Sequence, residues 1–245
     1  MDLNGKNALV TGAAKRIGRA IAIDLARLGC NIALHYGNSL AEAKATAKEI
    51  QALGVACRLY RADLSKAGQV KRLAQAVLRD FKICQILVNS ASVFPQVGLA
   101  AAKVRDFDLP YAVNLRAPAL LTQALGLALA RRKLPGRIIN IADVGGQLAW
   151  PGYLPYSLSK AALLQLTRTS ALALAPHVLV NSVSPGPMLM PAGHRGAQKR
   201  ASLKRTALGR LGGADEIAKT VSFVAQSDFM TGSDVVVDGG RKLVG

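Results

Sequence analysis

The sequence predicts an α/β fold in which a doubly wound, seven-stranded parallel sheet is flanked by helices on both faces. Short apolar runs recur with amphipathic helical stretches between them, and this alternation is typical of parallel strands joined by helical crossovers. The runs show little polar–apolar alternation, as expected of strands covered on both faces. They lie at residues 8–10, 32–34, 56–60, 86–88, 138–141, 178–183 and 235–237.

One domain accounts for the whole chain. Its 245 residues are 51% hydrophobic, enough for one sizeable core, and no repeat or Pro/Ser-rich linker divides them, so residues 1–245 are expected to form a single domain. The first residues lack the basic start and apolar middle of a secretory signal. The longest apolar stretch, 118–130, falls short of the ~20 residues of a membrane span. We therefore expect a soluble, cytoplasmic protein without a membrane partner.

The charge and the cysteines narrow the range of ligands. A net charge of +18 favours anionic ligands. No basic segment is interleaved with aromatic residues, which make up only 4% of the chain, so specific nucleic-acid binding is not expected. Cys30, Cys57 and Cys84 lack the spacing of a zinc site or a disulfide framework. They are interpreted as reduced core residues, and no metal site is predicted.

The segment after the first predicted strand has the pattern of a phosphate-binding turn. Gly12 permits a tight turn, Gly18 lets the next helix pack closely, and the start of that helix, near Ile17, offers unpaired N–H groups to a pyrophosphate. A glycine pattern alone is weak evidence, but this one lies between a strand and a helix in the first βαβ unit. We therefore predict a Rossmann-type, dinucleotide-binding fold.

The residues around this turn favour NADPH over NADH. An acid at the end of the second strand would bind a ribose 2′-hydroxyl and repel a 2′-phosphate. Lys15 and Arg16 add two cations at a helix start, where they oppose the helix dipole unless an anion compensates; a solvated helix start is the alternative. No acid precedes Glu42 in the segment that ends the second strand, which reads His35, Tyr36, Gly37, Asn38 and Ser39.

Two further segments end at the carboxyl edge of the predicted sheet, where doubly wound folds hold their ligands. Asp63 and Leu64 follow the third strand, and Asn89, Ser90 and Ala91 follow the fourth. These residues are predicted to contact the cofactor. For Asp63, capping of the segment that begins at Ser65 is an equally weighted alternative.

A tyrosine and a lysine follow the fifth strand. Tyr156 and Lys160 are four residues apart and share one face of a predicted helix. A neighbouring cation that stabilises the phenolate makes a tyrosine a useful acid near neutral pH. This pair is common in structural roles, but in a chain that opens with a dinucleotide turn it predicts proton transfer.

Together these motifs resemble the short-chain dehydrogenase/reductase family over nearly the full length. Residues 11–18 resemble its glycine motif, 89–91 its Asn-Asn-Ala-Gly motif, and Tyr156 and Lys160 its catalytic pair. The resemblance implies that Lys160 also binds the nicotinamide ribose, that Asn114 supports a water-linked proton relay, and that the protein is a homotetramer. It further assigns cofactor contacts to Pro185, Gly186 and Met188.

Three departures from the family pattern resemble pteridine reductases. Arg16 replaces the middle glycine, Ser92 replaces the glycine after residues 89–91, and Asp143 replaces the catalytic serine. This resemblance implies that the pterin contacts Arg16, Ser92, Phe94, Asp143 and Tyr156. Asn38 stands where some members carry a phosphate-binding arginine, which would weaken NADPH binding. A core position is the alternative for Phe94.

The replacement at 143 points to the reaction. An ionised carboxylate only accepts hydrogen bonds and would repel a developing alkoxide, so Asp143 disfavours ketone reduction. Reduction of a C=N bond needs a proton on nitrogen, which a carboxylate bonded to Tyr156 or to water can manage. We therefore predict NADPH-dependent reduction of a dihydropterin or dihydrofolate. A carbonyl reductase, a non-catalytic NADPH-binding protein and a basic nucleic-acid-binding protein are the alternatives, and for Asp143 a bracing role in its loop.

The segment at about 187–210 is expected to form a substrate loop. It is rich in Met, Gly and basic residues, and it lies where the family closes over its substrate. It is predicted to cover an anionic substrate, and an exposed basic helix is the alternative.

Overall fold

The computed structural model describes residues 1–189, 203 and 206–244, and within them seven strands form one parallel sheet. Their order is β3-β2-β1-β4-β5-β6-β7, so the winding direction reverses between β1 and β4. The predicted doubly wound sheet is confirmed, with boundaries shifted by one or two residues. The strands are β1 (Asn7–Val10), β2 (Asn31–Tyr36), β3 (Cys57–Arg61), β4 (Ile86–Asn89), β5 (Gly136–Ile141), β6 (Val178–Pro185) and β7 (Asp234–Val237).

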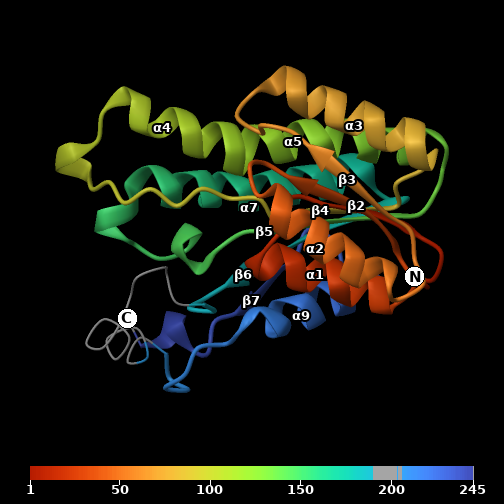
Figure 1. Cartoon of the computed structure of the whole chain (residues 1–245). Helices are drawn as coiled ribbons and strands as arrows, with labels where there is room; N and C mark the ends of the chain where they lie inside the picture. Colours follow the sequence, from red (N-terminus) through yellow and green to blue (C-terminus); the bar gives the residue numbers. More distant parts are fainter. Residues whose placement is uncertain (190–202, 204–205, 245) are drawn as a thin grey trace.

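Helices cover both faces of this sheet (Figure 1). One face carries α1 (Arg16–Arg27), α2 (Leu40–Gln51) and α9 (Ala214–Gln226). The other carries α3 (Ala67–Phe81), α7 (Leu154–Leu174) and a long helical run between them. Short helical turns connect these elements: η1 (Leu99–Ala101), η4 (Val144–Gly146), η5 (Pro151–Tyr153) and η6 (Arg241–Leu243).

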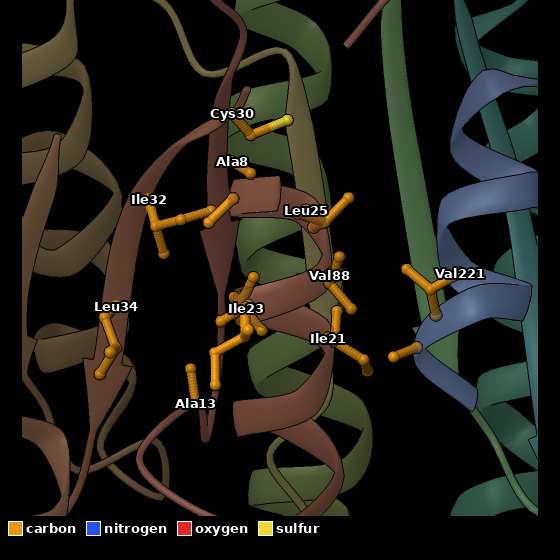
Figure 2. Close-up of a cluster of buried hydrophobic side chains, with 14 of the residues drawn as sticks. Ala8, Ala13, Ile21, Ile23, Leu25, Cys30, Ile32, Leu34, Val88 and Val221 are labelled. Carbon is orange, nitrogen blue, oxygen red and sulfur yellow. The ribbon is translucent and has the colours of Figure 1, made fainter. Parts of the chain in front are cut away.

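The core is split by the sheet, because successive side chains of a strand point to opposite faces. In β1, Ala8 and Val10 join the core under α1 and α9, whereas Leu9 joins the core under α3 and α7. Figure 2 shows the first of these cores, in which Ile21 and Leu25 of α1 lie near Val88 of β4. The three cysteines are buried free thiols, as predicted. The sheet is therefore packed against apolar side chains on both faces, and its strands also carry buried polar residues, among them Arg137 and Asn140 of β5 and Asn181 of β6.

The long helical run from Val104 to Arg131 contains two π-helical turns. Its parts are α4 (Val104–Pro110), η2 (Tyr111–Arg116), α5 (Ala117–Leu121), η3 (Thr122–Gly126) and α6 (Leu127–Arg131). This helix is longer than the apolar stretch expected from the sequence, and its length and composition would allow it to cross a membrane. However, 56% of its most apolar window is buried inside the fold, as in a core helix. The first π-helical turn matters for the site because it carries Asn114.

Candidate active site

A cleft of about 770 Å³ opens at the carboxyl ends of the central strands. Asp143 reaches it from the turn after β5, and Tyr156 and Lys160 reach it from the first turns of α7. Ser92 and Phe94 line it from the loop after β4. The ends of parallel strands meet at one edge, so residues far apart in the chain, such as Ser92 and Lys160, come together there.

Asp143 lies between two donors. Its Oδ2 accepts a hydrogen bond of 2.7 Å from the Tyr156 hydroxyl, and its Oδ1 accepts one of 2.7 Å from the backbone N–H of Gly145. The second contact caps the turn η4. Both interpretations of Asp143 from the sequence are therefore present in the structure: the carboxylate braces its loop and it contacts the tyrosine.

Burial shifts the acidities of this pair. Desolvation raises the pKa of the Asp143 carboxyl above its ordinary value, although the hydrogen bonds from Gly145 and Tyr156 and the charge of Lys160 act the other way. Desolvation, followed by the adjacent Asp143, raises the pKa of the Tyr156 phenol well above 10. The expectation that Lys160 makes Tyr156 a stronger acid is thus not met in this arrangement. The two groups instead retain a proton between them.

The amine of Lys160 is hydrogen-bonded to the backbone of β5. Its Nζ donates a 2.8 Å hydrogen bond to the carbonyl of Ile141 and lies 5.8 Å from the centroid of the Tyr156 ring. Burial lowers the pKa of this amine to about 8, and the charge of Asp143 partly offsets that effect. Lys160 is therefore a buried cation at the floor of the cleft whose charge is sensitive to pH near 8.

Both polar atoms of the Asn114 side chain are hydrogen-bonded within the protein. Its amide bonds both the N–H and the carbonyl of Val93, at 2.9 and 3.0 Å, and also bonds the hydroxyls of Ser92 and Ser159. The side chain is therefore not the part that can bind a relay water.

The turn after β1 is built for close approach of another chain segment. Gly12 has φ of +67°, a region that side chains with a Cβ disfavour, and a Cβ there would lie 2.9 Å from Cα of Ala91. The hydroxyl of Thr11 accepts hydrogen bonds from the N–H groups of Ser90 and Ala91, at 2.9 and 3.0 Å. This oxygen therefore ties the turn to the end of β4, across the point where the winding reverses.

His35 holds the same turn from the other side. Its Nδ1 accepts a 3.1 Å hydrogen bond from the N–H of Gly12, which leaves Nε2 to donate to the carbonyl of Ala62 at 3.1 Å. The ring is 2% exposed, and burial lowers its pKa to about 4. His35 was predicted to contact the cofactor. The structure instead engages both ring nitrogens within the protein, so the neutral ring supports the turn.

The ends of β2 and β3 lie further along the same edge. Asn38 is exposed beyond β2, and no acid is present there before Glu42 in α2. Asp63 accepts hydrogen bonds from the N–H and hydroxyl of Ser65, at 2.9 and 2.7 Å. These bonds lower the pKa of Asp63 and brace the turn before α3, whose N-cap is Lys66 and not Asp63.

An aromatic cluster forms one wall of the cleft. Phe94 is 50% exposed, stacks on Tyr153 with ring centroids 4.5 Å apart, and meets Tyr156 edge-on at 4.4 Å. It is not a core residue. Trp150 contacts both Phe94 and Tyr153 edge-on. Sequence reasoning missed Trp150 and Tyr153, although the single tryptophan of the chain, six residues before Tyr156, was a usable signal.

The predicted site residues fall into two groups. Those that line the cleft are Arg16, Ile17, Ser90, Ser92, Phe94, Asp143, Tyr156, Lys160, Pro185, Gly186 and Met188. Those that lie outside its lining, on the turns and strand ends described above or in the helix beside them, are Gly12, Lys15, Gly18, His35, Tyr36, Asn38, Ser39, Asp63, Leu64, Asn89, Ala91 and Asn114. Arg241 of η6 also lines the cleft and was not predicted. Most of the predicted substrate loop, residues 190–202 and 204–205, lies outside the described residues.

The edge of the sheet fits a dinucleotide. The first turn of α1 follows the glycine turn directly and has no acid that would repel a pyrophosphate. Lys15 and Arg16, both exposed at the start of α1, supply positive charge there. Lys160 lies further along the cleft, where a ring at the other end of the cofactor would meet Tyr156.

Comparisons with known proteins agree with this geometry. Residues 12–242 match the family model described as Enoyl-(Acyl carrier protein) reductase. The chain is similar to the 3-oxoacyl-[acyl-carrier-protein] reductase FabG of Staphylococcus epidermidis, with 34% identity over 97% of this chain and 99% of that protein.

Two solved structures have the same fold over the whole chain. A blue fluorescent protein from a metagenomic library, in complex with NADPH, has a TM-score of 0.90 and 32% identity, and the match covers 98% of this chain and 99% of that one. The reductase LugOII, which catalyses a keto-reduction in lugdunomycin biosynthesis, has a TM-score of 0.88 and 36% identity, covering 99% of this chain and 100% of that one. The chain therefore belongs to the short-chain dehydrogenase/reductase family of oxidoreductases.

Proposed function

We propose that this protein is an NADPH-dependent reductase of a C=N bond in a dihydropterin or dihydrofolate. The observation that carries the proposal is the 2.7 Å hydrogen bond from the Tyr156 hydroxyl to Asp143. A serine at position 143 would donate to a carbonyl oxygen, whereas this carboxylate accepts. The pair is therefore suited to handing a proton to a basic nitrogen.

The proton would come from the Tyr156–Asp143 pair. It is shared between Oη of Tyr156 and Oδ2 of Asp143, and burial raises the pKa of both groups, so the pair holds it at neutral pH. NADPH, when bound, supplies the hydride to the carbon of the C=N bond. The pair gives its proton to the nitrogen and regains one from solvent through the open cleft.

Lys160 and Phe94 would position the reactants. The Lys160 amine, fixed by the Ile141 carbonyl, lies where it can donate to a ribose hydroxyl and keep positive charge under the reacting groups. Phe94 exposes half of its surface to the cleft, which suits a flat heterocycle. Arg16, exposed at the start of α1, would bind phosphate.

Carbonyl reduction is the second candidate. It is favoured by the relatives, because one is named as a 3-oxoacyl reductase and another as a keto-reductase. It is also compatible with the raised pKa of Asp143, since a protonated carboxyl can donate to a carbonyl oxygen. An ionised Asp143 would oppose it.

A substrate panel with two variants tests the proposal. Oxidation of NADPH is followed with dihydrobiopterin, dihydromonapterin, dihydrofolate and a set of ketones, for the wild type, Tyr156→Phe and Asp143→Ser. Turnover of a dihydropterin that both substitutions lower by about 100-fold or more supports C=N reduction. Ketone turnover without pterin turnover, improved by Asp143→Ser, rejects it in favour of carbonyl reduction.

We also propose that the protein acts in the cytoplasm as a homotetramer. Apolar side chains are exposed on two helices of one face, Val104 and Leu109 on α4 and Leu158 and Leu172 on α7, and burial between subunits would remove them from water. Light scattering of the purified protein gives the number of subunits directly.

A further inference from the structure

Arg241 brings a positive charge to the cleft from the segment after β7. It lies in η6 and lines the cleft together with Asp143 and Tyr156. Among the described residues that line this cleft, the basic ones are Arg16, Lys160 and Arg241, and the one acid is Asp143. That carboxylate already accepts a hydrogen bond from the Tyr156 hydroxyl. The charges of the cleft therefore favour an anionic ligand.

The backbone around Arg241 is held in place by Asp238. The carboxylate of Asp238 accepts hydrogen bonds from the N–H groups of Gly240 and Lys242, at 2.9 and 2.8 Å. Asp238 also packs closely against the end of β6, since a Cβ at Gly186 would lie 2.6 Å from the Cα of Asp238. The side chain of Arg241 therefore starts from a fixed base at the edge of the sheet.

The segment that carries Arg241 also contacts the turn that begins at Asp143. The Lys242 amine donates a hydrogen bond to Oε1 of Gln147, the residue that follows η4. Trp150 of the aromatic wall packs on the same turn, because a Cβ at Gly145 would lie 2.6 Å from the Trp150 ring. The aromatic wall and the segment with Arg241 therefore flank one turn.

The strand order separates Arg241 from the expected place of the cofactor phosphates. The turn with Gly12 follows β1, whereas Arg241 follows β7, four strands further along the sheet. Neighbouring strands lie about 4.8 Å apart, which separates β1 from β7 by roughly 19 Å. Asp143 follows β5, which is two strands and thus about 10 Å from β7. This spacing favours the substrate, and not the pyrophosphate, as the ligand of Arg241.

Apolar side chains line the cleft beside these charges. Met188, Leu189 and Leu211 contribute to the lining, as does the aromatic wall. A ligand pocket of this kind binds the body of its ligand by apolar contact and orients it by a few polar groups. The cleft therefore suits a flat ring near Tyr156, an apolar arm, and an anionic group that reaches Arg241.

We propose that Arg241 is a specificity-determining residue that binds a carboxylate carried by the substrate on an apolar arm. The proposal rests on the proposed function and narrows it to substrates of the folate type, in which an aryl arm joins the pterin ring to glutamate carboxylates. A guanidinium and a carboxylate form paired, charge-assisted hydrogen bonds. The neutral side chain of dihydrobiopterin offers no such partner.

The test compares charged and neutral substrates in matched variants. With NADPH as the reductant, kcat and KM are measured for dihydrofolate, for dihydrobiopterin, and for dihydrofolate whose glutamate carboxylates are converted to amides. The proteins are the wild type, Arg241→Gln and Arg241→Lys. Arg72→Gln is the control, because it removes one positive charge from an exposed position of α3 outside the lining of the cleft.

The expected result is a change in the ratio of kcat/KM for dihydrofolate to kcat/KM for dihydrobiopterin. Arg241→Gln lowers this ratio about tenfold, through the KM for dihydrofolate, while Arg241→Lys keeps most of it and Arg72→Gln keeps all of it. In the wild type the amide analogue has a KM about tenfold above that of dihydrofolate. In Arg241→Gln the two KM values are equal, because the charge on the ligand no longer has its partner.

Failure of this inference can be distinguished from failure of the proposed function. An unchanged ratio in Arg241→Gln, in an enzyme that reduces both substrates, overturns the inference alone. An equal loss for both substrates with a raised KM for NADPH also overturns it, because Arg241 then serves the cofactor. If the wild type reduces dihydrobiopterin but not dihydrofolate, the inference again fails alone. If the wild type reduces no pterin, the proposed function fails and the inference fails with it.

Discussion

The hydroxyl of Tyr156 donates to the carboxylate of Asp143 at 2.7 Å, while Lys160, one helical turn away, donates to the carbonyl of Ile141. The tyrosine proton is therefore directed at a second acid–base group and not at the place where a substrate oxygen would lie. Desolvation raises the pKa of both Tyr156 and Asp143, and in the proposed reaction this pair supplies the proton.

Asp143→Asn tests whether the Tyr156–Asp143 pair supplies the proton. The amide keeps an oxygen for Tyr156 and Gly145 but cannot take up or release a proton near neutral pH. We expect kcat to fall by about 10²–10⁴-fold, the usual contribution of a general acid, with NADPH affinity retained. NADPH affinity is measured from Trp150 fluorescence, and folding from circular dichroism. A kcat within about threefold of the wild type would reduce Asp143 to a brace for its loop.

The lowered pKa of the Lys160 amine predicts how kcat/KM depends on pH. Burial lowers the pKa of its amine from 10.5 to about 8, so the amine loses its charge as the pH rises through that value. We expect kcat/KM, which reports the free enzyme, to fall above a pH of about 8. Lys160→Arg stays charged throughout and is expected to be slower but to lack this alkaline limb. An unchanged limb in the arginine variant would assign it to another group.

His35 predicts a loss of stability in acid. Its pKa is about 4 in the folded protein against 6.5 when exposed, so the unfolded chain binds the extra proton in between. The free energy of unfolding then falls with decreasing pH over this window, by roughly 3 kcal/mol from this group. His35→Asn cannot titrate and should have a flatter profile between pH 6.5 and 4 in urea unfolding.

Two substitutions of His35 separate its hydrogen bond to Gly12 from its effect on stability in acid. The asparagine oxygen of His35→Asn can still accept from the N–H of Gly12, whereas His35→Leu cannot. We expect the KM for NADPH to rise about tenfold in His35→Leu and much less in His35→Asn. Equal KM values in both variants would show that the bond to Gly12 does not shape the cofactor site.

Asn38 predicts cofactor preference. It is exposed just beyond β2, where a 2′-phosphate would lie and where no acid is present. Asn38→Arg should improve kcat/KM for NADPH, and Asn38→Asp should lower it and favour NADH, each by about tenfold. The ratio of kcat/KM for the two cofactors is the measurement. Unchanged ratios in both variants would place the phosphate elsewhere, for example against Lys15 and Arg16.

The sequence sufficed for the sheet, and it singled out Asp143, Tyr156 and Lys160, which the fold brings to one cleft. Apolar runs locate strands, and the spacing of Tyr156 and Lys160 places them on one helical face. The direction of each hydrogen bond could not be predicted from the sequence. That Tyr156 donates to Asp143, or that both nitrogens of His35 are used internally, depends on side chains brought together by the tertiary fold.

The wall of the cleft was also missed for a physical reason. Trp150 and Tyr153 lie in a loop and the short turn η5, where no periodicity distinguishes a ligand contact from a surface residue. Arg241 lies close to the end of the chain, far in sequence from every motif except the preceding glycines. Only the three-dimensional arrangement assigns these residues to the site.

The hydrogen bonds of Thr11 bear on whether coenzyme preference and substrate preference can evolve separately. The Thr11 hydroxyl connects β1 to the end of β4 where the strand order reverses, so Asn38, beyond β2, lies on one side of it and Ser92 and Asp143, beyond β4 and β5, lie on the other. Each side is anchored to its own strands. Preference for the coenzyme and preference for the reduced compound can therefore be altered one at a time, and substitutions at Asn38 and Ser92 should combine additively.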